Sequence, residues 1–452
     1  MNSTKKATTP LAICDLQSCA EHRQDPSTSS TPRIESSQSP QYVVGSRFAR
    51  TIVSWNVNFV FLVDMAPPLP NEIVLRILEF AYHLPDGRHD VKTMGACAAV
   101  CKQWTPIAQE LQFHTKAIGR NETYTTDEEL ELLDGKSRLG DYIRDLHVHV
   151  GLGNHTTNFD LGPPITQGAL DVPSFVDVLA HCPRLYQLKL ILDVHHFSED
   201  ELALLAALPV DIRALDLACA SVTSPALYQL LALWPDIHTL CLRTELIAPP
   251  PATRPNFSLY ELCLVRSVRP PVLEWLLPPL QDLASGRAPD LHILDFWDVP
   301  HDYPRELVAQ YAPHVRSLRL AYDPPAELIA PFTALEEFVL RTIPVLLPLP
   351  HLPHSVHHIR FHTLRSPSSF LQTFKHATAA MKALPDLERV TVSQTVADRK
   401  DFENFLKACD EKGLKPYIDP NFIQLPEYPV PVDHFPRLRT MENMYRMNTE
   451  TS

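Results

Sequence analysis

The hexapeptide LYQLKL, residues 185–190, carries the pattern that decides the fold. Its leucines stand at the first, fourth and sixth positions, so the pattern reads apolar-x-x-apolar-x-apolar. In an extended chain, neighbouring side chains point to opposite faces, and here Leu188 and Leu190 share one face while Lys189 faces the other way. The pattern therefore predicts a short strand that is apolar on one side and polar on the other.

The same pattern occurs ten times along the chain. The copies span residues 143–148, 185–190, 212–217, 237–242, 259–264, 291–296, 315–320, 335–340, 356–361 and 387–392. Seven of the nine start-to-start spacings lie between 20 and 31 residues, which is typical of leucine-rich repeats. We therefore predict an α/β fold, with a solenoid of parallel short strands inside and helices outside over residues 140–415. A further helix at about 401–412 is expected to cap the end of the repeats.

The segments between the copies have helical character. They are residues 175–182, 202–208, 227–234, 272–277, 306–312 and 370–384. Several are followed by a proline just before the next strand, and because proline cannot continue a helix, it ends each one. This punctuation accounts for part of the chain's 43 prolines.

The repeats depart from the family pattern at one position. Leucine-rich repeats usually carry an asparagine eight residues after the first leucine, and this chain has Asp193, Ala220, Glu245 and Ser267 there. We therefore expect an irregular solenoid.

Upstream of the repeats, residues 65–113 predict three short helices. The first follows LPNEI, residues 69–73, the second covers about 91–100, and the third begins at Pro106 and continues through Phe113. A unit of about 45 residues is near the lower limit for folding alone, so it should dock on something.

This unit resembles an F-box, although the likeness covers only about a tenth of the chain and its first loop, residues 85–92, is longer than usual. The start of the motif is LPNEI, an Ile-Leu pair follows, and VCKQW at residues 100–104 closes it with an alanine beyond. The resemblance implies that the unit docks on the Skp adaptor of a cullin-based ubiquitin ligase and that the repeats hold the substrate. The implied adaptor-binding residues are Leu69, Pro70, Ile73, Ile77, Leu78, Val100, Cys101, Trp104 and Ala108. The alternative is that these side chains only form the core of a small helical domain.

The strand pattern also predicts a binding face. Residues that alternate with the buried leucines point to the concave face of the sheet, and in the second half of the chain this row is rich in arginine and histidine, with Glu337 as the main exception. Arginine pairs with carboxylate or phosphate, and tryptophan is frequent in binding hot spots. We therefore expect an acidic or phosphorylated peptide of the substrate to bind here, the alternative being a solvated face with chance charges. The candidate residues are Trp297, Arg319, Arg341, His358, Arg360 and Arg389.

Composition and motifs argue against catalysis. Phosphate loops and nucleophile elbows need glycine, and the chain has only 12. The histidines between 351 and 362 have no cysteine near them in sequence, so we expect no metal site and no cofactor. The net charge of −13 argues against nucleic acid as a partner. We expect a protein that is not an enzyme. A third possible function is a catalytic solenoid, such as a repeat-type GTPase activator that uses an arginine, but the F-box-like unit argues against it and no arginine has a motif around it.

The remaining segments complete the expected organisation. Residues 1–64 are expected to be disordered, 114–139 to be a linker and 416–452 to be a polar tail. Residues 43–63 are unusually apolar, so either they pack on the body or Met65 is the natural start. No run is long enough to span a membrane and the nine cysteines have no framework spacing. These features indicate reduced cysteines, no membrane partner and a cytoplasmic or nuclear location.

Together these observations predict the substrate receptor of a Skp–cullin–F-box ubiquitin ligase. Such a receptor brings its substrate close to a recruited conjugating enzyme and performs no chemistry itself. The alternative function is a protein-interaction scaffold, built on the same repeats, that takes no part in a ligase.

Overall fold

The structure is a computed structural model of the whole chain. It describes residues 69–82, 90–118, 133, 139–151, 169–254, 256–280, 290–297, 304–321, 326–341, 352–361, 374–397 and 402–419. The predictions for residues 1–64, for most of the linker and for most of the tail lie outside the described residues.

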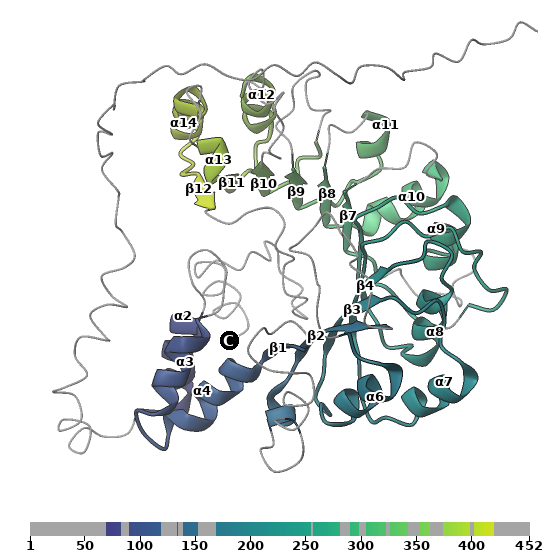
Figure 1. Ribbon diagram of the computed structural model, residues 1–452. Coiled ribbons are helices and arrows are strands. Elements are labelled where there is room, and N and C mark those ends of the chain that lie inside the picture. The colour runs from purple at the N-terminus through teal and green to yellow at the C-terminus, as the bar shows by residue number, and fades with distance from the viewer. Residues whose placement is uncertain are drawn as a thin grey trace, which may run out of the picture. The chain divides into compact units, whose positions relative to one another are not determined.

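Twelve parallel strands form one sheet, and they lie side by side in the order of the sequence (Figure 1). The strands are β1 (Thr115–Ala117), β2 (Asp145–Val150), β3 (Gln187–Leu192), β4 (Ala214–Cys219), β5 (Thr239–Leu242), β6 (Glu261–Leu264), β7 (Ile293–Phe296), β8 (Ser317–Leu320), β9 (Glu337–Leu340), β10 (His358–Phe361), β11 (Arg389–Ser393) and β12 (Tyr417–Asp419). Neighbours pair without a register slip, so that Leu188 pairs with Leu215 and Leu215 with Leu240. Parallel strands in sequential order are the topology of a repeat solenoid.

All ten predicted copies are strands. Each strand begins two residues after the first apolar residue of its copy, as β3 does at Gln187 after Leu185. The sheet extends beyond the predicted repeats at both ends. β1 lies in the segment expected to be a linker and pairs with β2, and β12 lies in the expected tail and pairs with β11.

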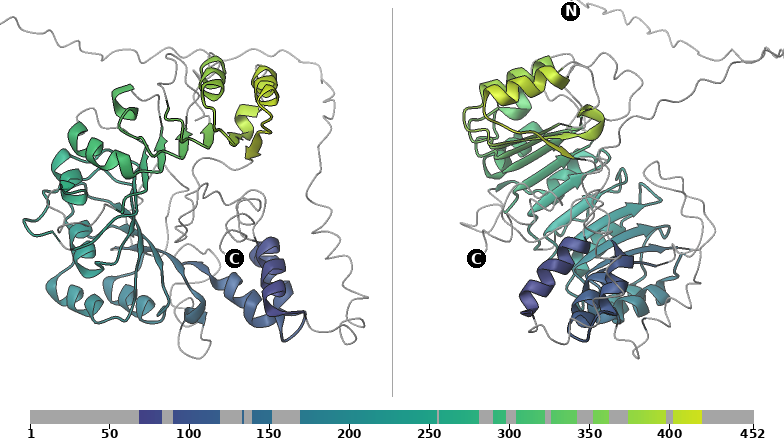
Figure 2. Two further views of the ribbon diagram at one scale, coloured as in Figure 1. Left: turned by 180° about the vertical axis from the view of Figure 1, so that it is seen from behind. Right: turned by 90° about the vertical axis from the view of Figure 1, so that its left-hand side faces the viewer.

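The connecting helices cover one face of the sheet (Figure 2). They are α6 (Val172–Ala180), α7 (Glu199–Ala206), α8 (Ala226–Leu233), α9 (Pro270–Leu276), α10 (Arg305–Tyr311), α11 (Ala326–Ile329), α12 (Lys375–Ala383), α13 (Gln394–Ala397) and α14 (Phe402–Glu411), with short 3-10 turns η1 (Leu139–Tyr142) and η3 (Ala312–His314). Local sequence starts several of them: Ser198 and Glu201 form a reciprocal capping box at α7, and the Asp171 carboxylate caps α6.

One continuous apolar core runs between the helices and the sheet. It contains the repeated leucines of the strands together with helix residues such as Phe175, Leu230 and Phe405. Burying one such side chain contributes about 1.5–3 kcal/mol, so the stacked repeats stabilise one another. The predicted mixed α/β solenoid is therefore confirmed.

The segment before the sheet forms three helices, as predicted. They are α2 (Asn71–Tyr82), α3 (Val91–Ala98) and α4 (Trp104–Phe113). They have a core of their own, made of Val74, Leu78, Tyr82, Met94, Cys97 and Ala108. We call residues 69–82 and 90–113 the helical unit.

Two further findings concern the described part of the chain. None of its helices is both long and apolar enough to cross a lipid bilayer. The seven cysteines within it, Cys97, Cys101, Cys182, Cys219, Cys241, Cys263 and Cys409, are free thiols.

Candidate functional site

Helix α2 has apolar residues on both of its faces. Val74, Leu78 and Tyr82, spaced four residues apart, are buried against α3 and α4. Ile73 and Ile77, also four apart, point away from that core and are 48% and 39% exposed. Helix α2 therefore carries more apolar side chains than the core of the helical unit buries, and the stripe of Ile73 and Ile77 is exposed.

The predicted adaptor-binding residues divide into three groups. Leu69, Pro70, Ile73, Ile77 and Val100 are exposed, and Cys101 and Trp104 are half-buried. Leu78 and Ala108 lie fully inside the helical unit. The last two therefore hold the unit together, and the exposed group can meet a partner.

Three exposed apolar residues were missing from that prediction. Phe80, 45% exposed, extends the stripe of Ile73 and Ile77 by one turn, and Leu75 and Val91 are exposed as well. The seven-residue spacing from Ile73 to Phe80 was the available signal. We call Leu69, Ile73, Ile77 and Val100 the apolar patch.

Polar contacts fix the ends of the helices that carry this patch. The Gln103 side chain donates to the Leu69 carbonyl at 2.5 Å and to Asn71 Oδ1 at 3.0 Å, which ties the start of α2 to the start of α4. The Asp90 carboxylate accepts the backbone N–H of Thr93 at 2.9 Å and so caps α3. The patch is therefore displayed on a connected, ordered unit.

The second candidate site is the polar sheet face, which we define as the face of β2–β11 opposite the apolar core. Sequence alternation places the predicted arginines and histidine there, and this placement is observed. Much of this face is not solvated, because Asp216, Asp295, Arg319, Glu337, Arg341, His358 and Thr391 are all buried. Residues in matched register on adjacent strands stand about 4.8 Å apart, so long side chains cover one another.

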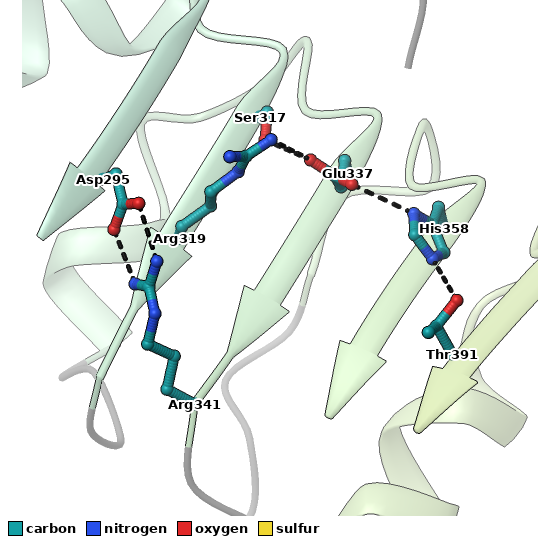
Figure 3. A network of polar contacts seen from close by, with 7 residues as sticks. All are labelled: Asp295, Ser317, Arg319, Glu337, Arg341, His358 and Thr391. Carbon is teal, nitrogen blue, oxygen red and sulfur yellow. Dashed lines mark hydrogen bonds and ion pairs between the residues drawn. The ribbon is translucent and has the colours of Figure 1, made fainter. Parts of the chain in front are cut away.

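Glu337 is the centre of one buried network (Figure 3). Its carboxylate pairs with Arg319 at 3.1 Å and also accepts hydrogen bonds from Ser317 and His358. Burial by itself would raise the pKa of Glu337, but the Arg319 guanidinium and these hydrogen bonds hold it well below its ordinary range. The glutamate is therefore ionised and neutralises the arginine that we expected to bind substrate.

His358 links this network to the next strand. Because a carboxylate only accepts, His358 Nδ1 donates to Glu337 at 3.1 Å, and Nε2 accepts from the Thr391 hydroxyl at 2.9 Å. Burial lowers the pKa of His358, and Arg389 and Arg360 lower it further against the opposing effect of Glu337. The imidazole is therefore neutral and both of its nitrogens are occupied.

Arg341 is held in a second network. Its two terminal nitrogens donate to the two carboxylate oxygens of Asp295 at 2.6 and 2.7 Å (Figure 3). The guanidinium also lies over the ring of Trp297, 4.1 Å from its centroid. Asp295 was visible in the strand alternation as a counter-charge, but its partner lies two strands away and could not be assigned from spacing.

Asp216 organises a third network in the first half of the face. Arg243 donates to both of its oxygens at 2.5 and 2.7 Å, and Lys189 lies 3.6 Å away. Burial alone would raise the pKa of Asp216, but Arg243 and Lys189 lower it below its ordinary value. The three networks make most of the polar face internally neutral.

Three of the six predicted substrate-binding residues keep accessible surface. Trp297, Arg360 and Arg389 are half-buried, whereas Arg319, Arg341 and His358 are buried. The Trp297 indole N–H is shielded from solvent and has no hydrogen-bond partner within the described ranges. A shielded donor of this kind favours an acceptor from a bound partner.

Comparison with known proteins gives little further information on the fold or the function of this chain. No family model matches the sequence, and no curated protein matches it. Among solved structures, an internalin from Listeria monocytogenes is similar over 73% of this chain and 88% of its own, at 12% identity and a TM-score of 0.28. That score is too low to support an argument, so the architecture rests on the strand order and register described above.

Proposed function

We propose that this protein is the substrate receptor of a Skp–cullin–F-box ubiquitin ligase. The helical unit docks on the Skp-type adaptor and, through it, on a cullin scaffold. The repeats hold a protein substrate for ubiquitination and degradation by the proteasome. The chain itself supplies no catalytic group.

The apolar patch carries this proposal. Its residues Leu69, Ile73, Ile77 and Val100 coincide with positions of the F-box-like motif and remain exposed in a folded unit. Contiguous exposed apolar surface usually marks a protein-binding site. The F-box-like motif supports a Skp-type adaptor as the partner, because a Leu-Pro start and a Val-Cys-Lys-x-Trp end occur together at F-box spacing.

Adaptor capture by the full chain tests the proposal. Ile73→Asp places a charge at the centre of the patch without touching the core and is expected to abolish capture of purified Skp adaptor. Leu204→Asp is the matched control, because Leu204 is an exposed leucine on α7, far along the sequence from the patch, and this variant should capture as the wild type does. Equal capture by the wild type and Ile73→Asp, with unchanged circular dichroism, would reject the F-box assignment.

The alternative is an interaction scaffold outside a ligase. The same apolar patch would serve such a protein, so adaptor binding alone does not separate the two functions. Reconstitution does: with adaptor, cullin and conjugating enzyme added, a ligase receptor promotes ubiquitin transfer to bound protein or to itself. A scaffold binds the adaptor without such transfer.

For the substrate, we propose an acidic or phosphorylated segment bound beside Trp297, Arg360 and Arg389. Among the described residues of β7–β11 and Arg341, the acids Glu337 and Asp295 are the partners of the buried Arg319 and Arg341. Arg360 of β10 and Arg389 of β11 stand further along the same row. Both arginines retain accessible surface.

Peptide binding tests this part. Arrayed peptides with phosphoserine, glutamate or serine at the same position serve as the probe, and Arg360→Glu/Arg389→Glu is expected to lose the preference for phosphoserine and glutamate. Arg213→Glu is the control, because Arg213 is exposed just before β4 and pairs with Asp211. Arg319 is unsuitable for the test, since replacing it breaks a buried ion pair. An unchanged preference in the double variant would contradict the proposal.

A further inference from the structure

Two cysteines stand side by side on the polar sheet face. Cys241 of β5 and Cys263 of β6 are direct register partners, and both are half-buried free thiols. Side chains at register partners of neighbouring parallel strands project from the same face, so the two thiols are neighbours. They lie between the network of Asp216 and that of Asp295, in the same row of the sheet.

Two arginines flank this dithiol. Arg243, bound to Asp216, is close enough to interact electrostatically with both cysteines, and Arg341, bound to Asp295, interacts with Cys263. Both carboxylates are already held by two hydrogen bonds from an arginine. The two acids and the two arginines therefore already satisfy one another, and the carboxylates are not available as further ligands.

The geometry is unfavourable for a disulfide. Side chains in matched register on parallel strands project in the same direction, so their Cβ atoms stay about 4.8 Å apart. A disulfide needs a Cβ separation of about 3.8 Å, and reaching it would require the two strands to move together. The pair is thus kept as two adjacent thiols.

We propose that Cys241 and Cys263 bind one Cu(I) ion through two thiolates. Thiolate sulfur is the ligand type that selects Cu(I), and an ion between the two sulfur atoms tolerates a wider spacing than a covalent bond. Zinc requires about four ligands, and the described residues contain no group of three or more His, Cys, Asp or Glu side chains able to hold a metal. Each thiol releases one proton to solvent, and copper stays in the +1 state.

The test uses the full chain under anaerobic conditions, with Cu(I) supplied as its bicinchoninate complex. Cys14 and Cys19 are replaced by serine throughout, because they stand five residues apart and could themselves hold Cu(I). This protein is expected to remove one Cu(I) per chain from the chelator. Cys241→Ser and Cys263→Ser should each remove none, whereas Cys101→Ser, which removes a half-buried thiol four residues from Cys97, should still remove one.

A second measurement uses the unmodified chain, so its result does not depend on whether a cysteine variant folds. Cu(I) should protect Cys241 and Cys263 of the unmodified chain from alkylation by iodoacetamide, as mapped by mass spectrometry. Full copper retention in either single-cysteine variant would overturn the proposal. So would unprotected thiols in the copper-loaded chain, or a Cys241–Cys263 disulfide in the purified protein.

Discussion

The helical unit and the polar sheet face reverse the usual distribution of side chains in opposite ways. The helical unit leaves apolar residues such as Ile73 and Ile77 exposed, whereas the sheet face buries charges such as Glu337 and Arg319. Exposed apolar surface and buried charge both cost free energy unless a partner compensates them. The two regions differ in where that partner is found.

On the sheet face the described partners are internal. Glu337 has Arg319, Asp295 has Arg341 and Asp216 has Arg243, each within ion-pair distance. In the helical unit, the side of α2 that carries Val74 and Leu78 is satisfied by α3 and α4, and the opposite stripe is open. The buried charges are therefore mainly structural, whereas the exposed apolar residues are the ones on which the proposed docking depends.

The largest effect is expected at Glu337. Glu337→Gln removes the charge that compensates Arg319 and leaves a buried guanidinium without its counter-ion, which typically costs about 3–5 kcal/mol. The free energy of unfolding from urea denaturation measures the loss.

The adjacent glutamate provides the control. Glu336 pairs with Arg316 at 2.7 Å, but both side chains are more than a quarter exposed, and exposed pairs contribute about 0–1 kcal/mol. Glu336→Gln should therefore change stability little. Similar losses in the two variants would mean that burial on the sheet face does not distinguish these pairs.

The second prediction compares neighbours in α2. Leu78→Ala opens a cavity in the core of the helical unit and should cost about 2–5 kcal/mol, seen as faster hydrogen exchange of the α2 amides. Ile77→Ala removes an exposed side chain and should cost less than about 1 kcal/mol, yet it should weaken adaptor capture.

The two variants, Leu78→Ala and Ile77→Ala, separate an effect on stability from an effect on adaptor binding at adjacent positions of α2. If Ile77→Ala speeds exchange as much as Leu78→Ala does, the open stripe packs on something within the chain. The apolar patch would then lose its status as a docking surface.

Features that depend on local geometry could be predicted from the sequence, whereas contacts between distant residues could not. Alternation along a strand and the heptad-like spacing in α2 were sufficient to place all ten repeat strands and the exposed positions Ile73 and Ile77, because these depend on local geometry alone. Burial of Arg319 and Arg341 depends on partners 18 and 46 residues away. Strand stacking sets which acid approaches which arginine, so the sequence predicted the arginine row but not the burial of Arg319 and Arg341 in ion pairs.

The smallest predicted effect is a pH dependence centred on His358. Its pKa is lowered in the folded protein, so the unfolded chain takes up a proton near the ordinary value of about 6.5 while the folded chain does not. The stabilisation is therefore present above that pH and is lost as pH falls toward the folded pKa, by up to about 1.4 kcal/mol per pH unit. His114, whose pKa is also lowered by burial, adds a change of the same sign, and Glu337 adds another below about pH 4.5.

Urea denaturation between pH 7.5 and 5 measures this effect. The free energy of unfolding should depend less on pH in His358→Gln than in the wild type. The matched variant His357→Gln, at the exposed neighbouring position, should follow the wild type. Parallel curves for all three proteins would show that His358 titrates alike in the folded and unfolded chains, and the sheet face would then be more open to water than its buried network indicates.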